Sequence, residues 1–279
     1  MRQAPACVIH SLWAQPRSSI SPQTMAAASH RCSSVLITGC SRGLGRGLVE
    51  GLATAPHPPD LIIATCRQPE GAQELQKLRK KYNNIRILQL DVVSEESRQR
   101  VVQEVTELLG DQGLNCLINN AGENILASLD DVTAENMLQV YETNTVAQLM
   151  VTKAFLPLLK QAAQLNHGMG WHRAVIVNMS SISASIHLVQ DKDIYLQIYP
   201  YRISKAALNM LTKCLAADLK VDGILCIALH PGWLKTDMGG DQAPMQIEES
   251  VPSILSVLAH LREEDSGCFL DWKGEIVPW

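Results

Sequence analysis

The sequence lacks the features that mark membrane proteins and nucleic-acid-binding proteins. No apolar run in its 279 residues reaches the roughly eighteen residues that a membrane-spanning helix needs. The formal net charge is -4, so there is no basic excess of the kind that attracts nucleic acid, and an anionic ligand would need a local positive site. We therefore expect a soluble protein with no membrane span and no nucleic-acid partner.

Paired cysteines are also absent. The eight cysteines form no C-x2-C pair and no cysteine–histidine cluster with the spacing of a zinc site. Several lie within apolar runs, as Cys226 does, where cysteine packs as a small hydrophobic residue. We expect reduced thiols, which are typical of a cytoplasmic protein, and no bound metal.

Acidic residues are missing before Glu50, and the first thirty residues hold several arginines and serines. This composition is typical of a mitochondrial transit peptide, but Pro5, Pro16 and Pro22 would interrupt its amphipathic helix. Met25, followed by small residues, resembles a natural start. Residues 1–32 are thus predicted to be a disordered or alternatively started extension, or a targeting segment if 1–24 form a transit peptide. The folded domain is predicted to span 33–279.

From Ser34 onward, short apolar runs alternate with longer segments of helical period, as in βα units with a parallel sheet. The predicted strands are rich in aliphatic residues, as burial on both faces requires, and span 35–38, 61–65, 85–90, 116–119, 174–178 and 224–229. Helices are predicted at 43–54, 70–82, 95–109, 134–160, 201–220 and 246–261. Since no repeat or linker interrupts this pattern, we predict a single-domain α/β Rossmann-type fold, a doubly wound parallel sheet with helices on both faces.

A glycine-rich segment follows the first predicted strand and opens the first predicted helix. Its glycines have the spacing Gly-x3-Gly-x-Gly, which lets the backbone approach a pyrophosphate while free N–H groups at the helix start meet the negative charge. A glycine-rich turn without a ligand is the alternative. We predict a dinucleotide phosphate site formed by Gly39, Ser41, Arg42, Gly43, Leu44 and Gly45.

The end of the second strand distinguishes NAD from NADP, because an acid there binds the ribose hydroxyl and an arginine binds the 2'-phosphate. The nearest acid, Asp60, precedes this strand, whereas Arg67 follows it. Arg67 and Arg42 are predicted to form a fork for the phosphate. Solvated surface arginines are the alternative interpretation, and NADP(H) is favoured over NAD(H).

Tyr201 and Lys205 are four residues apart in a predicted helix and therefore share one face. A phenol beside an ammonium is a candidate proton donor, since a nearby cation lowers the pKa of tyrosine toward neutrality. Such a pair also arises by chance on helix surfaces, so its meaning depends on the rest of the chain.

Seven motifs in a fixed order resemble the short-chain dehydrogenase/reductase family over nearly the whole chain after Ser33. They are the turn from Thr38 to Gly45, Asp91 after the third strand, Asn119-Asn120-Ala121-Gly122, Asn144, Ser180-Ser181, Tyr201-x3-Lys205 and Pro231-Gly232. The segment from Tyr199 to Asn209 and the tail from Gly274 to Trp279 resemble the branch of sniffer-type carbonyl reductases and bacterial C-factor proteins.

The resemblance implies a catalytic set of Asn144, Ser181, Tyr201 and Lys205. In it Tyr201 protonates a carbonyl oxygen, Ser181 binds that oxygen, Lys205 lowers the tyrosine pKa and holds the nicotinamide ribose, and Asn144 holds a water. It also implies a cofactor shell in which Asp91 and Val92 lie by the adenine, Asn119, Ala121 and Gly122 line the adenosine side, and Pro231, Gly232 and Thr236 border the nicotinamide. Tyr201 and Lys205 belong to both sets.

One segment departs from the family pattern, and the role of a second segment is undecided from the sequence. Tyr201 follows Ser181 by 20 positions, a longer separation than is common in the family, which enlarges the loop beside the substrate and leaves the choice between Ser180 and Ser181 open. Residues 237–243 are predicted to be either a mobile lid over the nicotinamide or an ordinary surface loop.

The expected function is NADPH-dependent transfer of hydride to an aldehyde, ketone or quinone-like carbonyl, with Tyr201 as the general acid/base. The alternative is a sensor or signalling protein of C-factor type that binds NADP(H) with little turnover. The resemblance further implies a homodimer or homotetramer that packs through the helices predicted at 134–160 and 201–220.

Overall fold

The structure, a computed structural model, describes residues 31–189 and 197–279. Residues 1–30 of the predicted extension and the middle of the long loop before Tyr201 lie outside the described residues, so the predictions for them stay predictions. Arg31 and Cys32 belong to the compact unit Arg31–Trp279. Cys32 is buried and Arg31 forms an ion pair with Asp60.

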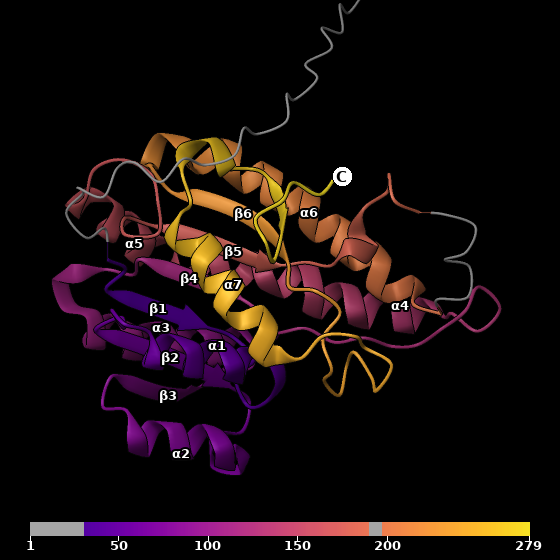
Figure 1. Cartoon of the computed structure of the whole chain (residues 1–279), viewed down its shortest axis with the longest axis horizontal. Coiled ribbons are helices and arrows are strands. Elements are labelled where there is room, and N and C mark those ends of the chain that lie inside the picture. Colours follow the sequence, from indigo (N-terminus) through magenta and orange to yellow (C-terminus); the bar gives the residue numbers. More distant parts are fainter. Residues whose placement is uncertain (1–30, 190–196) are drawn as a thin grey trace, which may run out of the picture. The chain divides into compact units, whose positions relative to one another are not determined.

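Seven parallel strands form one sheet in the order β3-β2-β1-β4-β5-β6-β7. The strands are β1 (Ser34–Ile37), β2 (Leu61–Cys66), β3 (Ile85–Gln89), β4 (Cys116–Asn119), β5 (Val175–Met179), β6 (Leu225–His230) and β7 (Phe269–Asp271). The helices are α1 (Gly43–Thr54), α2 (Gln73–Lys81), α3 (Glu95–Leu109), α4 (Ala134–Tyr141), α5 (Ala147–Leu165), α6 (Tyr199–Leu219) and α7 (Ile247–Ala259). Figure 1 shows the strands side by side between the helices.

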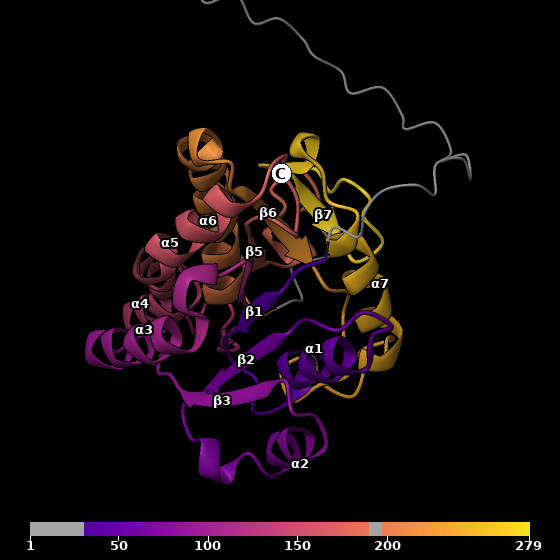
Figure 2. The ribbon, with the colours of Figure 1, turned by 90° about the vertical axis from the view of Figure 1, so that its left-hand side faces the viewer.

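Helices cover both faces of the sheet, as predicted (Figure 2). On one face α1, α2 and α7 contribute Leu48, Leu75 and Ile254 to a single apolar cluster with the strands. On the other face α3 and α5 contribute Val105 and Phe155 to a second cluster. Because the central strands are buried on both sides, they read as continuous aliphatic runs rather than as alternating patterns.

From β1 the chain adds β2 and β3 on one side of the sheet and then returns to add β4 to β7 on the other side of β1. The order of the strands therefore reverses between the neighbours β1 and β4. In an open α/β sheet, ligands bind at such a point, in the crevice beyond the carboxyl ends of the strands. The glycine turn after β1 and the segment after β4 both lie at this crevice.

Two predicted helices differ from the structure, and one strand was not predicted. The helix predicted at 134–160 is α4 and α5 joined by a π-helical turn, Glu142–Val146, because Asn144 makes tertiary hydrogen bonds within this turn. The helix predicted at 70–82 begins as a 3-10 turn, Pro69–Gly71, before α2. Strand β7 was not predicted, since its three residues are too few for a recognisable period.

The remaining strands and helices agree with the predicted ranges within about two residues. Helix α3 begins after Ser94, whose side chain accepts a hydrogen bond from the amide of Ser97. The negative charges of Glu95 and Glu96 in the first turn stabilise the positive end of the helix dipole. Within residues 31–189 and 197–279, no helix combines the length and the apolarity needed to cross a bilayer.

Candidate active site

The glycine turn joins β1 to α1 at the crevice. Gly39 and Gly43 have φ angles of 75° and 58°, which residues with a Cβ rarely adopt. A Cβ at Gly45 would lie 2.3 Å from the carbonyl oxygen of Gly39. No side chain caps the start of α1, and its first turn contains no acid. The turn therefore presents helix N–H groups and the positive end of the helix dipole to an anion.

Thr38 and Asn120 hold the glycine turn against the segment after β4. The hydroxyl of Thr38 accepts hydrogen bonds from the amides of Asn120 and Ala121 at 3.0 and 2.9 Å. The Asn120 side chain donates to the carbonyl oxygens of Thr38 and Gly39. Both residues stand within motifs visible in the sequence, but neither was included among the predicted site residues.

The two predicted phosphate-binding arginines lie in different surroundings. Arg42 forms a 3.1 Å ion pair with Asp237. Arg67 is exposed just beyond β2, and among the ion pairs of the described residues none includes it. Ser41 is exposed beside Arg42, whereas Leu44 packs on the core. Asp237 therefore engages one of the two arginines of the predicted fork, and their joint binding of a phosphate stays a prediction.

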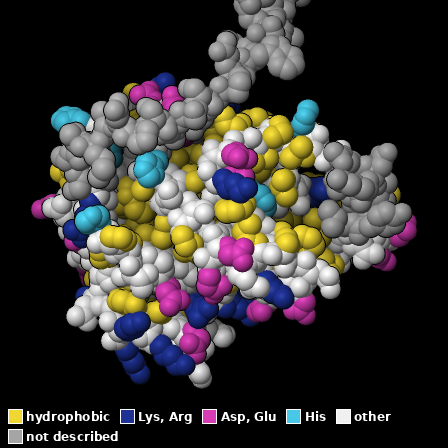
Figure 3. Space-filling model, viewed as in Figure 1, with side chains coloured by type: hydrophobic (Ala, Val, Ile, Leu, Met, Phe, Trp, Pro, Cys, Tyr) yellow, Lys and Arg dark blue, Asp and Glu magenta, His cyan; other side chains and the backbone are white. Residues whose placement is uncertain are grey.

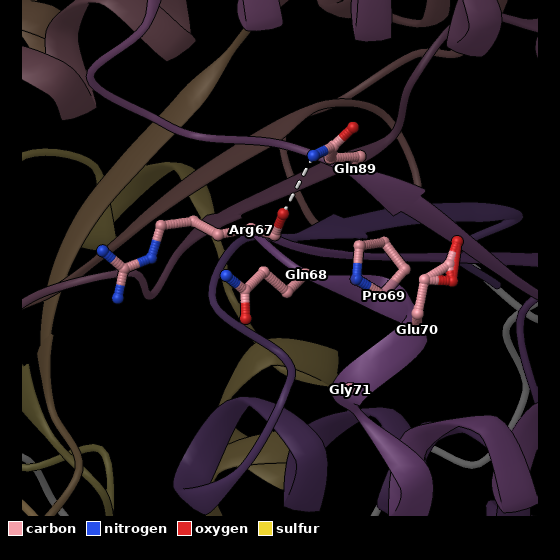
Figure 4. Close-up of a pocket in the computed structure, with 6 residues that line it drawn as sticks. All are labelled: Arg67, Gln68, Pro69, Glu70, Gly71 and Gln89. Carbon is pink, nitrogen blue, oxygen red and sulfur yellow. Dashed lines mark hydrogen bonds between the residues drawn. The ribbon is translucent and has the colours of Figure 1, made fainter.

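A hollow of about 340 Å³ opens at the end of β2. Its lining residues are Arg67, Gln68, Pro69, Glu70, Gly71 and Gln89. Figure 4 shows the Arg67 guanidinium extending away from Pro69 and Glu70, while Gln89 donates a 3.1 Å hydrogen bond to the Arg67 carbonyl oxygen. Asp60 is paired with Arg31 before the strand, and Glu70 lines the hollow on the side from which the Arg67 guanidinium extends away.

Asp91 and Val92 follow β3. One carboxylate oxygen of Asp91 accepts a hydrogen bond from the amide of Val93, and the Asp91 amide donates to the hydroxyl of Ser97. Val92 is buried in the apolar cluster beneath α3 and α5. The structure thus leaves Asp91 at the crevice edge and directs the Val92 side chain into the core.

The predicted residues after β4 also divide between core and site. The Asn119 side chain donates to Thr152 and Asn178 at 3.0 and 2.8 Å, so it ties β4 to α5 and β5 instead of facing a ligand. Ala121 closes against Gly39. A Cβ on Gly122 would lie 3.0 Å from the Asn144 amide oxygen and 3.6 Å from Lys205 Nζ, so the absence of a side chain there keeps the space beside Lys205 clear.

Tyr201, Lys205 and Ser181 come together at the other end of the crevice. The phenol of Tyr201 hydrogen-bonds with Ser181, and Lys205 Nζ lies 5.7 Å from the centre of the tyrosine ring. Ser180 instead donates to Asn209 at 2.6 Å, on the buried side of α6. The geometry therefore favours Ser181 over Ser180 as the partner of a substrate oxygen.

Burial controls the protonation of this pair. It raises the pKa of the Tyr201 phenol, an effect that the hydrogen bond with Ser181 opposes. It lowers the pKa of Lys205 to about 8. The prediction that Lys205 brings the tyrosine pKa below its usual value is wrong for this arrangement, because desolvation dominates and the ammonium donates to the carbonyl oxygen of Met179. Tyr201 accordingly holds its proton at neutral pH.

Asn144 is fully buried in the π-helical turn. Its side chain accepts from the amide of Glu123 and donates to the Glu123 carbonyl oxygen, both at 2.9 Å, and also donates to Ser204 at 3.0 Å. Ser204 in turn donates to the carbonyl oxygen of Tyr201. These bonds join the segment after β4 to α6, and the predicted water-holding role of Asn144 stays a prediction.

Pro231, Gly232 and Thr236 follow β6. The Pro231 carbonyl oxygen accepts from Ser250 at 2.6 Å. Gly232 has a φ angle of 91°, and a Cβ there would lie 2.8 Å from the sulfur of Met245. A Cβ at Gly43 would lie 3.7 Å from Thr236. The third predicted part of the cofactor shell therefore lies against the glycine turn.

The segment predicted as a lid or a surface loop, 237–243, is tied at several points. Trp233 donates from its indole nitrogen to the Gly239 carbonyl oxygen, and the amide of Gly239 donates to the Thr236 hydroxyl. The Arg42–Asp237 ion pair joins the same segment to α1. These contacts describe an ordered loop at the crevice.

Comparison with known proteins identifies relatives of the whole folded unit. A model of the short chain dehydrogenase family matches residues 33–247. NADPH-bound carbonyl reductase from chicken fatty liver is 46% identical with a TM-score of 0.86, covering 89% of this chain and 100% of its own. Carbonyl reductase Sniffer of D. melanogaster is 43% identical with a TM-score of 0.86 and the same coverage.

A curated relative is similar over a shorter stretch. The C-signal protein of Myxococcus xanthus is 36% identical over 167 residues, which is 60% of this chain and 93% of that protein. Its alignment is therefore nearly complete for the smaller protein. The family model matches residues 33–247, which include β1 to β6. This chain therefore belongs to the short-chain dehydrogenase family.

Proposed function

We propose that the protein is an NADPH-dependent carbonyl reductase that transfers hydride to an aldehyde, ketone or quinone-like carbonyl. The observation that carries this proposal is the pairing of Tyr201 with Ser181 beside the buried Lys205. Two hydroxyl groups that meet at one point can both bind a carbonyl oxygen, and one of them can transfer a proton to it.

The protonation states favour the direction of reduction. Because the pKa of Tyr201 is raised, the phenol is protonated at neutral pH and can serve as the general acid. Lys205, with a pKa of about 8, is mainly protonated at pH 7 and provides positive charge beside the phenol as it donates its proton. The bound cofactor would supply the hydride, and Lys205 would also hold its ribose.

The residues of the crevice fit a dinucleotide. The glycine turn offers helix N–H groups without a competing acid. Gly122 leaves space beside Lys205 that a Cβ would fill. The exposed Arg67 at the end of β2 supports a 2'-phosphate and hence NADP(H) over NAD(H). Lysine and arginine side chains also gather over α2 (Figure 3), but those of its last turn, Arg79, Lys80 and Lys81, lie toward the amino ends of the strands and not beside Arg67.

The proposed cofactor set retains the remaining predicted residues. In it Asp91 borders the adenine, with Val92 supporting it from the core. Ala121, Gly122 and the backbone of Asn119 line the adenosine side, and Pro231, Gly232 and Thr236 border the nicotinamide. NADPH bound to the chicken relative, 46% identical, supports this assignment.

A panel of aldehydes, ketones and quinones tests the proposal through the loss of NADPH absorbance. Replacement Tyr201→Phe should lower kcat/KM by about 10²- to 10⁴-fold, the usual contribution of a general acid, with NADPH affinity retained. Tyr199→Phe is the matched control, because Tyr199 is on the same helix and 40% exposed. Unchanged turnover in Tyr201→Phe would refute the assigned mechanism.

The likeness to C-signal favours a second candidate, an NADP(H)-binding sensor with little turnover. It shares the cofactor shell with the reductase but needs no proton donor. Tight NADPH binding with no oxidation of the cofactor by any member of the panel would support the sensor. Turnover that depends on Tyr201 would exclude it as the main activity.

We infer that two copies pack through α4, α5 and α6. Exposed apolar side chains on these helices support the inference, since Leu138 is 68% exposed and Met210 is 65% exposed. Sedimentation equilibrium should give a homodimer or homotetramer, and Met210→Glu should shift it toward monomer. A monomeric native chain at micromolar concentration would contradict the inference.

We also infer a cytoplasmic location. The cysteines of the described residues are free thiols, most of them buried, which supports a reducing compartment. Fractionation of cells that express the tagged full chain tests this. Recovery in mitochondria, abolished by removal of residues 1–24, would instead establish the transit-peptide alternative.

A further inference from the structure

Residues 277–279 form part of an antiparallel return along the edge of the sheet. After β7 the chain turns at Gly274, whose φ angle is 85°. Val277 then donates to the Phe269 carbonyl oxygen at 2.8 Å, and Ile276 pairs with Leu270. The return covers the edge of β7 and brings residues 277–279 to the segment that follows Ser181.

Two hydrogen bonds connect this return to the segment 185–189, and a third lies within the segment. The hydroxyl of Ser185, a residue only 2% exposed, donates to the Pro278 carbonyl oxygen at 2.6 Å and accepts from the amide of Leu188 at 3.2 Å. The amide of His187 donates to the Trp279 carbonyl oxygen at 2.9 Å. One buried hydroxyl thus closes the turn of the segment and fastens it to the return.

Apolar contacts support the same junction. The Trp279 ring stacks on Phe269 with centroids 5.6 Å apart, and Lys213 Nζ of α6 lies 5.7 Å from the centre of the Trp279 ring. Leu188 packs on a small cluster formed by Ala228, Phe269 and Val277. In Figures 1 and 2 the chain end marked C lies by β6, next to these elements. Trp279 therefore contacts both the sheet, through its ring, and the segment 185–189, through its carbonyl oxygen.

The fastened segment begins one short turn after Ser181. The 3-10 turn Ile182–Ala184 separates them and is closed by its own hydrogen bonds, from Ala184 to the Ser181 carbonyl oxygen and from Ser185 to that of Ile182. Ser181 is therefore held independently of the return. The segment beyond the turn exposes apolar side chains, with Ile186 77% and Val189 52% exposed.

We propose that Ser185 and Trp279 are positioning residues for substrate specificity: they fix the segment 185–189 as an apolar wall of the substrate mouth beside Ser181. This wall would contact the part of a carbonyl compound that extends beyond its reacting group, and so would discriminate in favour of substrates with a large apolar or aromatic substituent. The proposal rests on the proposed reductase function for its kinetic consequence, but not for its structural one.

Hydrogen exchange of the full chain tests the structural consequence without any turnover. Ser185→Ala and Trp279→Ala should speed exchange of the amides of His187 and Leu188 by about tenfold or more, because protection reflects the free energy of local opening. Trp279→Phe, which keeps a ring on Phe269, should restore protection. Ile276→Ala is the matched control, since its side chain is 56% exposed on the same return.

Steady-state kinetics test the specificity. With a bulky aromatic quinone, Ser185→Ala should raise KM about three- to tenfold, as expected for one lost hydrogen bond. Trp279→Ala should raise KM by a similar factor, because it removes the ring that stacks on Phe269. With a short aliphatic aldehyde, kcat and KM should change less than about twofold, since Ser181 is held separately.

The outcomes separate the two proposals. Unchanged exchange at His187 and Leu188 in both variants would overturn the positioning role, as would an equal loss with large and small substrates. Faster exchange in the two variants, together with a native chain that fails to oxidise NADPH with any carbonyl of the panel, would contradict the reductase function and leave the positioning of the segment supported.

Discussion

The buried ammonium of Lys205 donates a 2.7 Å hydrogen bond to the carbonyl oxygen of Met179, the last residue of β5. The bond links α6 to the strand that leads to Ser181. It satisfies one of the three N–H groups of the ammonium, yet burial still lowers the pKa of Lys205 to about 8. The end of the crevice that holds Tyr201 and Ser181 therefore retains a positive charge at a cost in stability.

That cost predicts a pH dependence of stability. The folded-state pKa of Lys205 is below the unfolded value, so the unfolded chain binds more protons between about pH 8 and 10.5, and stability from this group rises with pH through that window. The contribution should be about 3 kcal/mol between the two limits. Urea unfolding of the native chain and of Lys205→Met at pH 7, 8, 9 and 10 measures the difference in pH dependence.

The expected result is that the stability difference between the two proteins shifts in favour of the native chain as pH rises. Comparison with Lys205→Met cancels the titration of the remaining groups. Parallel stability curves across the whole range would mean that the Lys205 pKa is not depressed in the folded state.

The separate surroundings of Arg67 and Arg42 predict unequal effects on cofactor choice. Arg67→Ala should raise the Kd for NADPH by about 10- to 100-fold, the change for a lost charged hydrogen bond, and leave the Kd for NADH almost unaffected. Arg42→Ala should have a smaller effect, because Asp237 already engages its guanidinium. Asp237→Asn should release Arg42 and strengthen NADPH binding. Titration of each variant with NADPH and NADH by fluorescence checks the order.

High salt provides an internal control for these arginine variants, since the exposed ion pair of Arg42 and Asp237 is screened. Asp237→Asn and the native chain should then converge in NADPH affinity. A loss of NADH binding in Arg67→Ala as large as that of NADPH would contradict a role in recognising the 2'-phosphate.

Close packing of the glycine turn predicts that Gly45 tolerates no side chain. Gly45→Ala would place a Cβ 2.3 Å from the Gly39 carbonyl oxygen and 2.6 Å from the Asn120 amide, so the turn must shift. We expect a loss of about 1–3 kcal/mol in the free energy of unfolding together with loss of NADPH binding. Thermal unfolding and NADPH fluorescence titration measure the two effects.

Gly71→Ala is the matched control for this substitution. A Cβ at Gly71 meets nothing within 4 Å, and Gly71 is not among the glycines with positive φ, so stability should change by less than about 0.5 kcal/mol. Equal effects of the two substitutions would contradict the explanation by steric contact.

Much of the fold was predictable because neighbouring residues encode it. Two-sided burial makes each central strand a short aliphatic run, and the helical period marks α1 and α3 at their observed bounds. Strand β7 escaped prediction because three residues carry no period. The break between α4 and α5 escaped it because the π-helical turn depends on the bonds of Asn144 to Glu123 and Ser204, which lie on other segments.

The sequence by itself determined the parallel sheet, the glycine turn and the pairing of Tyr201 with Lys205 on one helix face, since these follow from local period, turn chemistry and spacing. Asn144 and Ser181 entered the predicted set through the family resemblance. Only the tertiary structure decided which polar group each side chain meets. Asp237 reaches Arg42, Asn119 turns into the core, and burial raises rather than lowers the pKa of Tyr201. The reason is physical: partner choice and desolvation depend on how distant segments pack, which strand register and helix contacts determine together.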